Sequence, residues 1–227
     1  MTPGAQPPAW PPILIAPGLF NSPPEHWQSH WERDLPGAER VQQENWDLPT
    51  LGEWTAGLLE AVRRRPGAVV VAHSLGCAVV AHLARIGAGH GIGGALLVAP
   101  AEVNRGSPVG RLLNGFSPMP REPLPFPSTV AASRDDPYVS LDQAAAFAHA
   151  WGSRFVDLGA AGHINVKSGH GPWPRGLELL GELVGRIDRH AFEQAEGPAL
   201  RRSGSLSSSK PTEAFPPFSN SDHSHRN

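Results

Sequence analysis

The chain has 227 residues, of which 40% are hydrophobic, so it is long and apolar enough for one domain of ordinary size with a real core. Its formal net charge of −2 and the absence of a long basic run make nucleic-acid binding through a broad basic face unlikely. A single cysteine, Cys77, excludes an internal disulfide framework and a cysteine-based zinc site, and no apolar run is long enough to span a bilayer.

Short apolar runs alternate along the chain with segments whose apolar residues lie three and four apart. Most of the short runs are apolar on both faces, which is typical of strands in a sheet that is covered on both sides. The predicted strands are 13–16, 40–43 (weakly marked), 68–72, 95–99, 129–132 and 154–158. The predicted helices are 25–35, 51–65, 75–86, 141–151 and 177–192. This alternation predicts a three-layer α/β domain with a mainly parallel sheet of about six strands and helices on both faces.

The predicted domain covers residues 12–196 and has weaker segments around it. Residues 1–11 form a Pro-rich lead-in, and the Ser/Pro-rich stretch 197–227 is too polar to fold alone, so we expect a disordered tail. Residues 101–126 contain five prolines and little periodicity. We interpret them as a long ordered loop that is too short for a large cap domain.

The stretch with the clearest chemistry is the junction between strand 68–72 and helix 75–86. Ser74 lies at this junction, and the small residues Ala72 and Gly76 flank it two positions away on either side. In a nucleophile elbow, small residues are needed there because strand and helix nearly touch, and the turn presents the serine hydroxyl above the sheet. The alternative is that Ser74 merely caps the helix, and the motif alone leaves both interpretations open.

Two further polar groups follow later strands in the order that a serine hydrolase requires. Asp135 and Asp136 follow strand 129–132, and His163 lies in a small-residue loop after strand 154–158. Each feature has an ordinary explanation, since Asp-Asp-Pro is a common turn and the chain has eleven histidines. A histidine can accept the serine proton when a carboxylate holds its other nitrogen, so the three groups together predict a hydrolytic site.

The chain resembles the small α/β-hydrolases of the retinoblastoma-binding serine hydrolase and YdeN family. The resemblance depends on Ala-Pro-Gly-Leu at 16–19, Ser-Pro-Pro-Glu-His-Trp at 22–27, His-Ser-Leu-Gly at 73–76, Asp-Asp-Pro at 135–137 and Gly-His-Ile-Asn at 162–165. It implies an α/β-hydrolase fold with Ser74 as nucleophile, His163 as base and Asp136 as the acid, with Asp135 as a rival. It also implies that the backbone N–H groups of Leu19 and Leu75 form an oxyanion hole. The chain departs from the family's common pattern at Ala72 and at Pro17-Gly18.

Other aromatic and histidine residues near these motifs have simpler roles. Trp27 and Trp31 are most simply core residues, although their place after the first strand suggests that they could line an acyl pocket. His26 and His30 have a metal-binding spacing but no third ligand, so no metal site is predicted. His73, at the end of a buried strand, is expected to be structural and to point away from the Ser74 hydroxyl.

We therefore expect a serine hydrolase that cleaves carboxylic esters, or related acyl bonds, of small substrates through an acyl-enzyme intermediate. It needs no cofactor, and its open site favours short acyl groups. The N-terminus lacks the basic region of a secretory signal, so we expect a cytoplasmic enzyme. The alternatives are a protein-interaction module on a hydrolase scaffold and an acyltransferase or amidase that uses the same three residues. The sequence identifies no protein partner.

Overall fold

The computed structural model describes residues 10–104, 113 and 115–203, and it describes no side chains from residue 190 onward. The chain divides into two compact units, Met1–Ala191 and Phe192–Asn227. All the strands belong to the first unit. Of the second unit, only the end of a helix is described.

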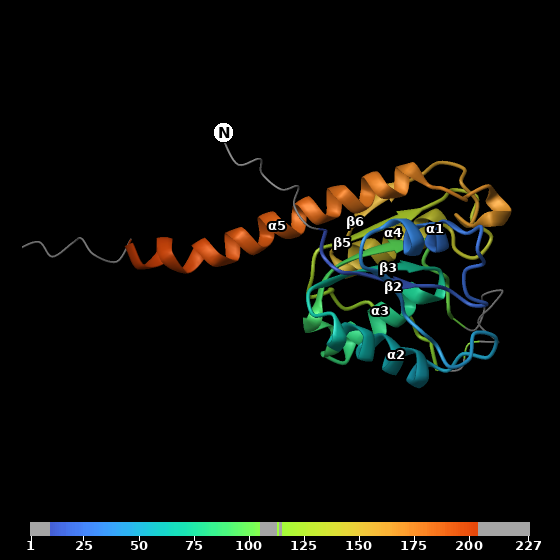
Figure 1. The fold of residues 1–227 in the computed structure, drawn as a ribbon, viewed down its shortest axis with the longest axis horizontal. Coiled ribbons are helices and arrows are strands. Elements are labelled where there is room, and N and C mark those ends of the chain that lie inside the picture. The colour runs from blue at the N-terminus through green and yellow to red at the C-terminus, as the bar shows by residue number, and fades with distance from the viewer. Residues whose placement is uncertain (1–9, 105–112, 114, 204–227) are drawn as a thin grey trace, which may run out of the picture. The chain divides into compact units, whose positions relative to one another are not determined.

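A six-stranded parallel sheet forms the centre of the first unit (Figure 1). Its strands are β1 Ile13–Ala16, β2 Ala38–Arg40, β3 Ala68–His73, β4 Ile92–Val98, β5 Ser128–Ala132 and β6 Arg154–Asp157. Their spatial order is β2-β1-β3-β4-β5-β6, and every neighbouring pair is parallel. The predicted α/β architecture with a parallel sheet of about six strands is confirmed.

Helices cover both faces of this sheet. The described helices are α1 Trp27–Asp34, α2 Leu51–Arg64, α3 Leu75–Arg85, α4 Leu141–Trp151, α5 Pro174–Ser203 and the short 3₁₀ helices η1 Ala88–Gly91 and η3 Val166–Ser168. Buried side chains of α2, α3 and α4 belong to one core cluster, and those of α1 and the start of α5 belong to the other. Figure 1 shows α2 and α3 on one side of the sheet. No helix among the residues described is long and apolar enough to cross a membrane.

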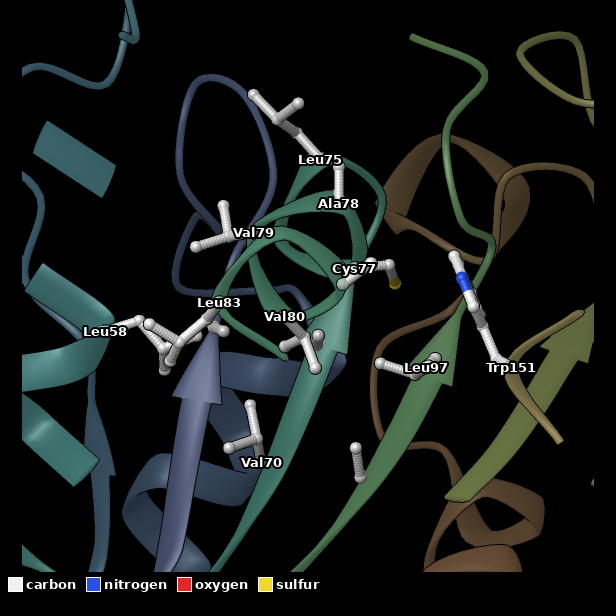
Figure 2. Packing of buried hydrophobic residues seen from close by; sticks show 14 of the residues in the cluster. Leu58, Val70, Leu75, Cys77, Ala78, Val79, Val80, Leu83, Leu97 and Trp151 are labelled. Atoms are coloured by element: carbon white, nitrogen blue, oxygen red, sulfur yellow. The ribbon is translucent and has the colours of Figure 1, made fainter. Parts of the chain in front are cut away.

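The two core clusters divide the side chains of each strand by their alternating direction. In β3, Val70 and Ala72 belong to the cluster with α3, whereas Val69 and Val71 belong to the cluster with α1. All six residues of β3 are buried, which explains why its sequence is apolar on both faces. Figure 2 shows α3 above β3, with Val80 pointing toward the strand that carries Val70.

Most helix and strand bounds lie within two residues of the predicted bounds. Strands β2 and β4 and helix α5 differ by more. The edge strand β2 begins at Ala38 rather than at residue 40. The prediction missed its start because its three residues are half-buried and give little hydrophobic signal. Strand β4 begins at Ile92 rather than at residue 95. The prediction missed this start because glycine has a low strand propensity and two glycines follow Ile92. Helix α5 begins at Pro174, a residue that suits a first helical turn, and it continues past residue 197 to Ser203.

The predicted terminal segments and loop lie partly outside the described residues. This applies to residues 1–9 of the lead-in, 105–112 and 114 of the loop, and 204–227 of the tail. The described residues between β4 and β5 contain no helix, and Phe116 and Met119 pack in the core cluster with α2 and α3. This connection therefore covers the core instead of building a cap, as far as it is described.

The order of the strands fixes where a ligand can approach the sheet. From β1 the chain first adds β2 on one side and then returns to place β3 on the other side. The segments that leave β1 and β3 therefore run in opposite directions and leave a crevice at the carboxyl ends of these two strands. Gly18 and Leu19 follow β1, and Ser74 follows β3, so the topology brings these segments together.

Candidate active site

Ser74 lies in a strained turn between β3 and α3. Its backbone angles are φ 53° and ψ −118°, a region that L-residues rarely adopt, and its side chain makes no capping hydrogen bond to the helix. A Cβ on Gly76 would lie 2.3 Å from the carbonyl oxygen of Ala16, so only glycine fits the close approach of helix to strand. A nucleophile elbow requires a strained turn with small flanking residues, and the Ser74 side chain does not cap the helix.

A continuous chain of hydrogen bonds joins the three polar groups that the sequence singles out. The hydroxyl of Ser74 lies 2.9 Å from Nε2 of His163. On the other side of the ring, Nδ1 of His163 lies 2.8 Å and 2.9 Å from the two carboxylate oxygens of Asp136. A carboxylate can only accept, so Nδ1 carries the proton and Nε2 is left to accept from the hydroxyl. The Asp136 side chain is fully buried.

The neighbouring carboxylate, Asp135, has different partners. It accepts hydrogen bonds from the Ser133 hydroxyl (2.6 Å) and from the backbone N–H of Gly162 (2.7 Å). These two donors lower its pKa, with the hydroxyl as the larger cause. Asp135 therefore contacts the backbone of the loop that carries His163, while Asp136 contacts the ring itself.

The turn after β1 lies beside the Ser74 hydroxyl. A Cβ built on Gly18 would lie 2.8 Å from Cβ of Ser74. Neither Leu19 nor Leu75 donates its backbone N–H to another residue within the described part of the chain. Since Leu75 is also the first residue of α3, its N–H has no partner within the helix and contributes to the positive end of the helix dipole.

Buried polar side chains hold the turn after β1 in place. Gln28 on α1 is fully buried, accepts from the Ser22 hydroxyl at 2.7 Å, and donates to the carbonyl of Val71 in β3 at 3.1 Å. Arg40 on β2 donates to the Asn21 side chain at 2.7 Å and to the Ser22 carbonyl at 2.9 Å. These contacts explain how Phe20 and Asn21 can both keep positive φ angles, at 66° and 64°.

A cavity of about 530 Å³ opens at Ser74 and His163. Apolar side chains such as Leu19, Phe20, Leu113 and Val166 line it, together with Tyr138 and Lys167. The Tyr138 ring meets the His163 ring edge-on at a centroid distance of 4.5 Å. Lys167 is the one Lys, Arg, Asp or Glu side chain among the described residues that line the cavity.

Trp27 and Trp31 do not lie in this cavity. Their side chains are 0% and 2% exposed, pack edge-on against each other at 4.8 Å and join the core cluster of α1 and α5. The expectation that they line an acyl pocket is therefore corrected. Two tryptophans one helical turn apart form a core stripe, and only their closeness to the first turn suggested a pocket. Trp27 instead donates its indole N–H to the carbonyl of Ile164 at 2.8 Å.

The other histidines near the site make ordinary hydrogen bonds. His26 caps α1 by accepting from the Gln28 N–H, and burial, followed by the charge of Arg40, lowers its pKa to about 3. His30 contacts the Arg33 guanidinium. Among the described residues, no group of three or more His, Cys, Asp or Glu side chains could hold a metal ion. His73, the residue before Ser74, points to the backbone of His163, not to the Ser74 hydroxyl.

Sequence reasoning missed several residues that shape the site. Gln28 and Arg40 gave no signal because their polar partners come from distant segments. Tyr138 and Lys167 stood two and four residues from the candidate carboxylate and histidine, and a search of the strand-end loops for rim residues would have found them. Asn165, part of the resemblance motif, also lines the cavity.

Comparisons with known proteins agree with this geometry. The sequence pattern of the serine hydrolase family matches residues 13–182. A YdeN-like hydrolase from Pectobacterium atrosepticum is 35% identical, with a TM-score of 0.70 over 78% of this chain and 92% of that chain. The ydeN gene product of B. subtilis is 20% identical, with a TM-score of 0.64 over 77% of this chain and 99% of that chain. A comparison with curated proteins found no match.

A more distant likeness extends to esterase 2 of Thermogutta terrifontis, solved in a form phosphonylated by cyclosarin. It is 17% identical, with a TM-score of 0.60 over 82% of this chain and 86% of that chain, and at this identity it supports the fold alone. The family match covers most of the chain, and the Pectobacterium relative exceeds 30% identity over nearly its whole length. The chain therefore belongs to the serine hydrolase family and is a small YdeN-like hydrolase with the α/β-hydrolase fold.

Proposed function

We propose that the enzyme cleaves carboxylic esters of small substrates through Ser74, His163 and Asp136. The observation that carries this proposal is the unbroken hydrogen-bond chain from the Ser74 hydroxyl through His163 to the buried Asp136 carboxylate. In the first step, Oγ of Ser74 attacks the ester carbonyl while Nε2 of His163 takes the hydroxyl proton. Asp136 holds the ring in the correct tautomer and stabilises the imidazolium that forms.

The negative charge of the tetrahedral intermediate develops beside the turn after β1. The free N–H groups of Leu19 and Leu75 are the donors that stabilise it, and the helix dipole of α3 acts in the same direction. Losing one such donor typically raises the barrier by about 3–4 kcal/mol.

Three further proton transfers through His163 complete the reaction. The imidazolium of His163 donates its proton to the departing alcohol as the carbon–oxygen bond breaks, which leaves an acyl ester on Ser74. His163 next takes a proton from a water molecule that attacks this ester, and returns it to Ser74 as the carboxylic acid leaves. Ser74 and His163 finish in their starting states, so the net reaction consumes one ester and one water and releases an alcohol and an acid.

Covalent labelling tests the nucleophile directly. We expect a fluorophosphonate probe to modify Ser74, as located by mass spectrometry, and we expect labelling to disappear in Ser74→Ala and to slow strongly in His163→Ala. His149→Ala, at an exposed position on α4, is the matched control and should label like the wild type. Absence of labelling in the folded wild-type protein would favour the interaction-module alternative.

The length of the acyl group tests the substrate class. Because the cavity is apolar and of moderate volume, and no helix covers it in the described β4–β5 connection, we expect short acyl groups to be preferred. Specificity constants for p-nitrophenyl esters should fall steeply from acetate to decanoate, whereas a preference for long chains would contradict the proposal. Adding alcohol or amine acceptors, or offering anilides, separates a hydrolase from an acyltransferase or an amidase.

A further inference from the structure

Two consecutive residues, His73 and Ser74, both contact His163. The Ser74 hydroxyl lies 2.9 Å from the ring nitrogen Nε2 of His163, and Nε2 of His73 lies 2.9 Å from the backbone carbonyl oxygen of the same residue. A carbonyl oxygen only accepts, so His73 carries its proton on Nε2 and donates it. The residue that precedes the nucleophile thus contacts the backbone of the base.

His73 is placed to act as a permanent donor in this contact. Its side chain is 5% exposed, and its ring lies 4.8 Å from the His163 ring and 5.0 Å from the His26 ring. Burial is the main cause that lowers the pKa of His73 well below its usual value, followed by the charges that His163 and His26 carry when protonated. His73 therefore stays neutral near pH 7.

A second side chain contacts the next carbonyl of the same loop. The Trp27 indole donates to the backbone oxygen of Ile164 at 2.8 Å. Ile164 is fully buried and has a φ of 50°, an unusual backbone angle for a β-branched residue. Such a conformation persists when its surroundings hold it, and the indole contact is one of the restraints.

The opposite side of the loop is held by the segment after β5. Ala161 donates its N–H to the Ser133 hydroxyl at 2.8 Å, and Gly162 donates its N–H to Asp135 at 2.7 Å. Backbone groups of four successive residues, 161–164, are thus each bound by a side chain from another element. The position of the His163 backbone is fixed from both sides, and His73 connects it directly to β3, the strand that precedes Ser74.

We propose that His73 is a positioning residue, which sets the distance between the Ser74 hydroxyl and the His163 ring by holding the His163 carbonyl. The proposal rests on the proposed function, since it gives His73 a role only if His163 is the base. An error of about 1 Å in such a geometry can cost on the order of 100-fold in rate. His73 lies in the cavity wall but is only 5% exposed, so we expect the loss to fall mainly on kcat and little on KM.

The first experiment compares three variants, each assayed well below its own unfolding temperature. His73→Phe keeps the ring volume but removes the donor, and we expect kcat to fall about 10- to 100-fold with little change in KM. His73→Gln places an amide N–H near the same point and should restore most of kcat. The matched control is His82→Phe, because His82 is also buried and its Nε2 lies 2.9 Å from a carbonyl, that of Phe116. This control should lower the unfolding temperature as much as His73→Phe does and leave kcat unchanged.

A second experiment asks whether His73 acts through His163. In a His163→Ala background, the base is absent, so adding His73→Phe should change the residual rate less than about twofold. A merely structural His73 would instead cause the same fold loss in both backgrounds. Equal kcat in His73→Phe and His82→Phe, or additive losses in the double variant, would overturn the proposal.

The two proposals fail in different ways. If the wild-type protein neither labels at Ser74 nor hydrolyses esters, the proposed function fails whatever His73 does. If the wild type is active and His73→Phe matches the control, only the positioning role fails. Should His73→Phe not fold, Trp27→Phe removes the adjacent restraint at the Ile164 carbonyl and the same comparison of kcat, KM and additivity applies.

Discussion

Among single residues, Lys167 is the one that gives the described cavity wall a positive charge. It is exposed on η3, and the other described side chains that line the cavity are apolar or neutral polar ones and histidines. An exposed ion pair contributes about 0.2–1 kcal/mol, which corresponds to roughly a 1.4- to fivefold preference. We therefore expect the enzyme to favour esters whose acyl chain ends in a carboxylate over neutral esters of the same length.

The measurement is the ratio of kcat/KM for the mono-p-nitrophenyl ester of glutaric acid to that for p-nitrophenyl butyrate. Lys167→Glu should lower this ratio by roughly the square of the effect of Lys167→Ala, and added salt should reduce both effects. The neutral ester serves as the internal control, because its rate should not change. An unchanged ratio in Lys167→Glu would show that the lysine does not contact the substrate.

The two adjacent carboxylates allow a sharp comparison. The buried carboxylate of Asp136 contacts Nδ1 of His163, the nitrogen that defines the tautomer. Asp135 instead contacts the backbone of the loop that carries His163. Asp136→Asn should lower kcat by about 10⁴-fold, as loss of the carboxylate does in the chymotrypsin-type triad. Asp135→Asn keeps an oxygen acceptor for the Gly162 N–H and should cost far less. Equal losses in the two variants would contradict the assignment of Asp136 as the acid.

At the scale of elements, the elbow depends on how closely α3 approaches the end of β1. A methyl group on Gly76 meets backbone atoms, the carbonyl oxygens of Ala16 at 2.3 Å and Pro17 at 2.8 Å, which cannot rotate away. Gly76→Ala should therefore lower the free energy of unfolding by about 1–3 kcal/mol and displace Ser74. In contrast, Gly181→Ala on α5 meets no atom within 4 Å and should raise it by about 0.5–1 kcal/mol. Urea unfolding of both variants checks the pair, and a stable, active Gly76→Ala would refute the close-contact argument.

The elements that the sequence predicts well are those whose signals are local. Helix α2 shows this, because Thr50 accepts from the Glu53 N–H and donates to the Glu53 carboxylate, as the spacing of the two residues indicates. Helix α4 has its predicted bounds, with Ser140 as its cap and Gly152 at its end in the left-handed region. Strand β2 was poorly marked because it is short, half-buried and at the edge of the sheet.

The residues of the candidate site also differ in whether a local sequence signal identifies them. Ser74 and His163 could be named from the sequence, because each follows a recognisable strand and the order of the strands is characteristic of the fold. The roles of Trp27, Gln28 and His73 could not, since each depends on a contact with a residue at least 12 positions away. Local periodicity carries no information about which distant carbonyl a buried indole, amide or imidazole reaches.

At the scale of the whole molecule, burial favours the neutral form of the histidines next to the candidate site. His26 and His73 are buried, and the groups whose positive charge faces His26 are Arg40 and, when they are protonated, His163, His170 and His30. Protonating His26 would also remove the Nδ1 acceptor that caps α1, next to the turn after β1. The stability of the fold is therefore coupled to the protonation of these histidines.

The sign of this coupling follows from the lowered pKa values. Between pH 6.5 and about 3, the unfolded chain binds a proton at His26 that the folded chain excludes, so the free energy of unfolding falls as the pH falls. Each such histidine contributes a slope of up to about 1.4 kcal/mol per pH unit, and the contribution is complete above the unfolded pKa. His73, with its pKa also lowered, acts in the same direction.

His26→Asn isolates one histidine from the carboxylates that also titrate in this range. Asparagine is a good helix cap and can accept from the Gln28 N–H in place of the imidazole, so α1 should keep its start. We expect urea unfolding measured from pH 7.5 to pH 4 to give a shallower loss of stability in His26→Asn than in the wild type, with the two curves diverging below about pH 6. Parallel curves would mean that His26 titrates alike in the folded and unfolded chains. The free energy of unfolding would then not depend on the protonation of His26, and this prediction would be wrong.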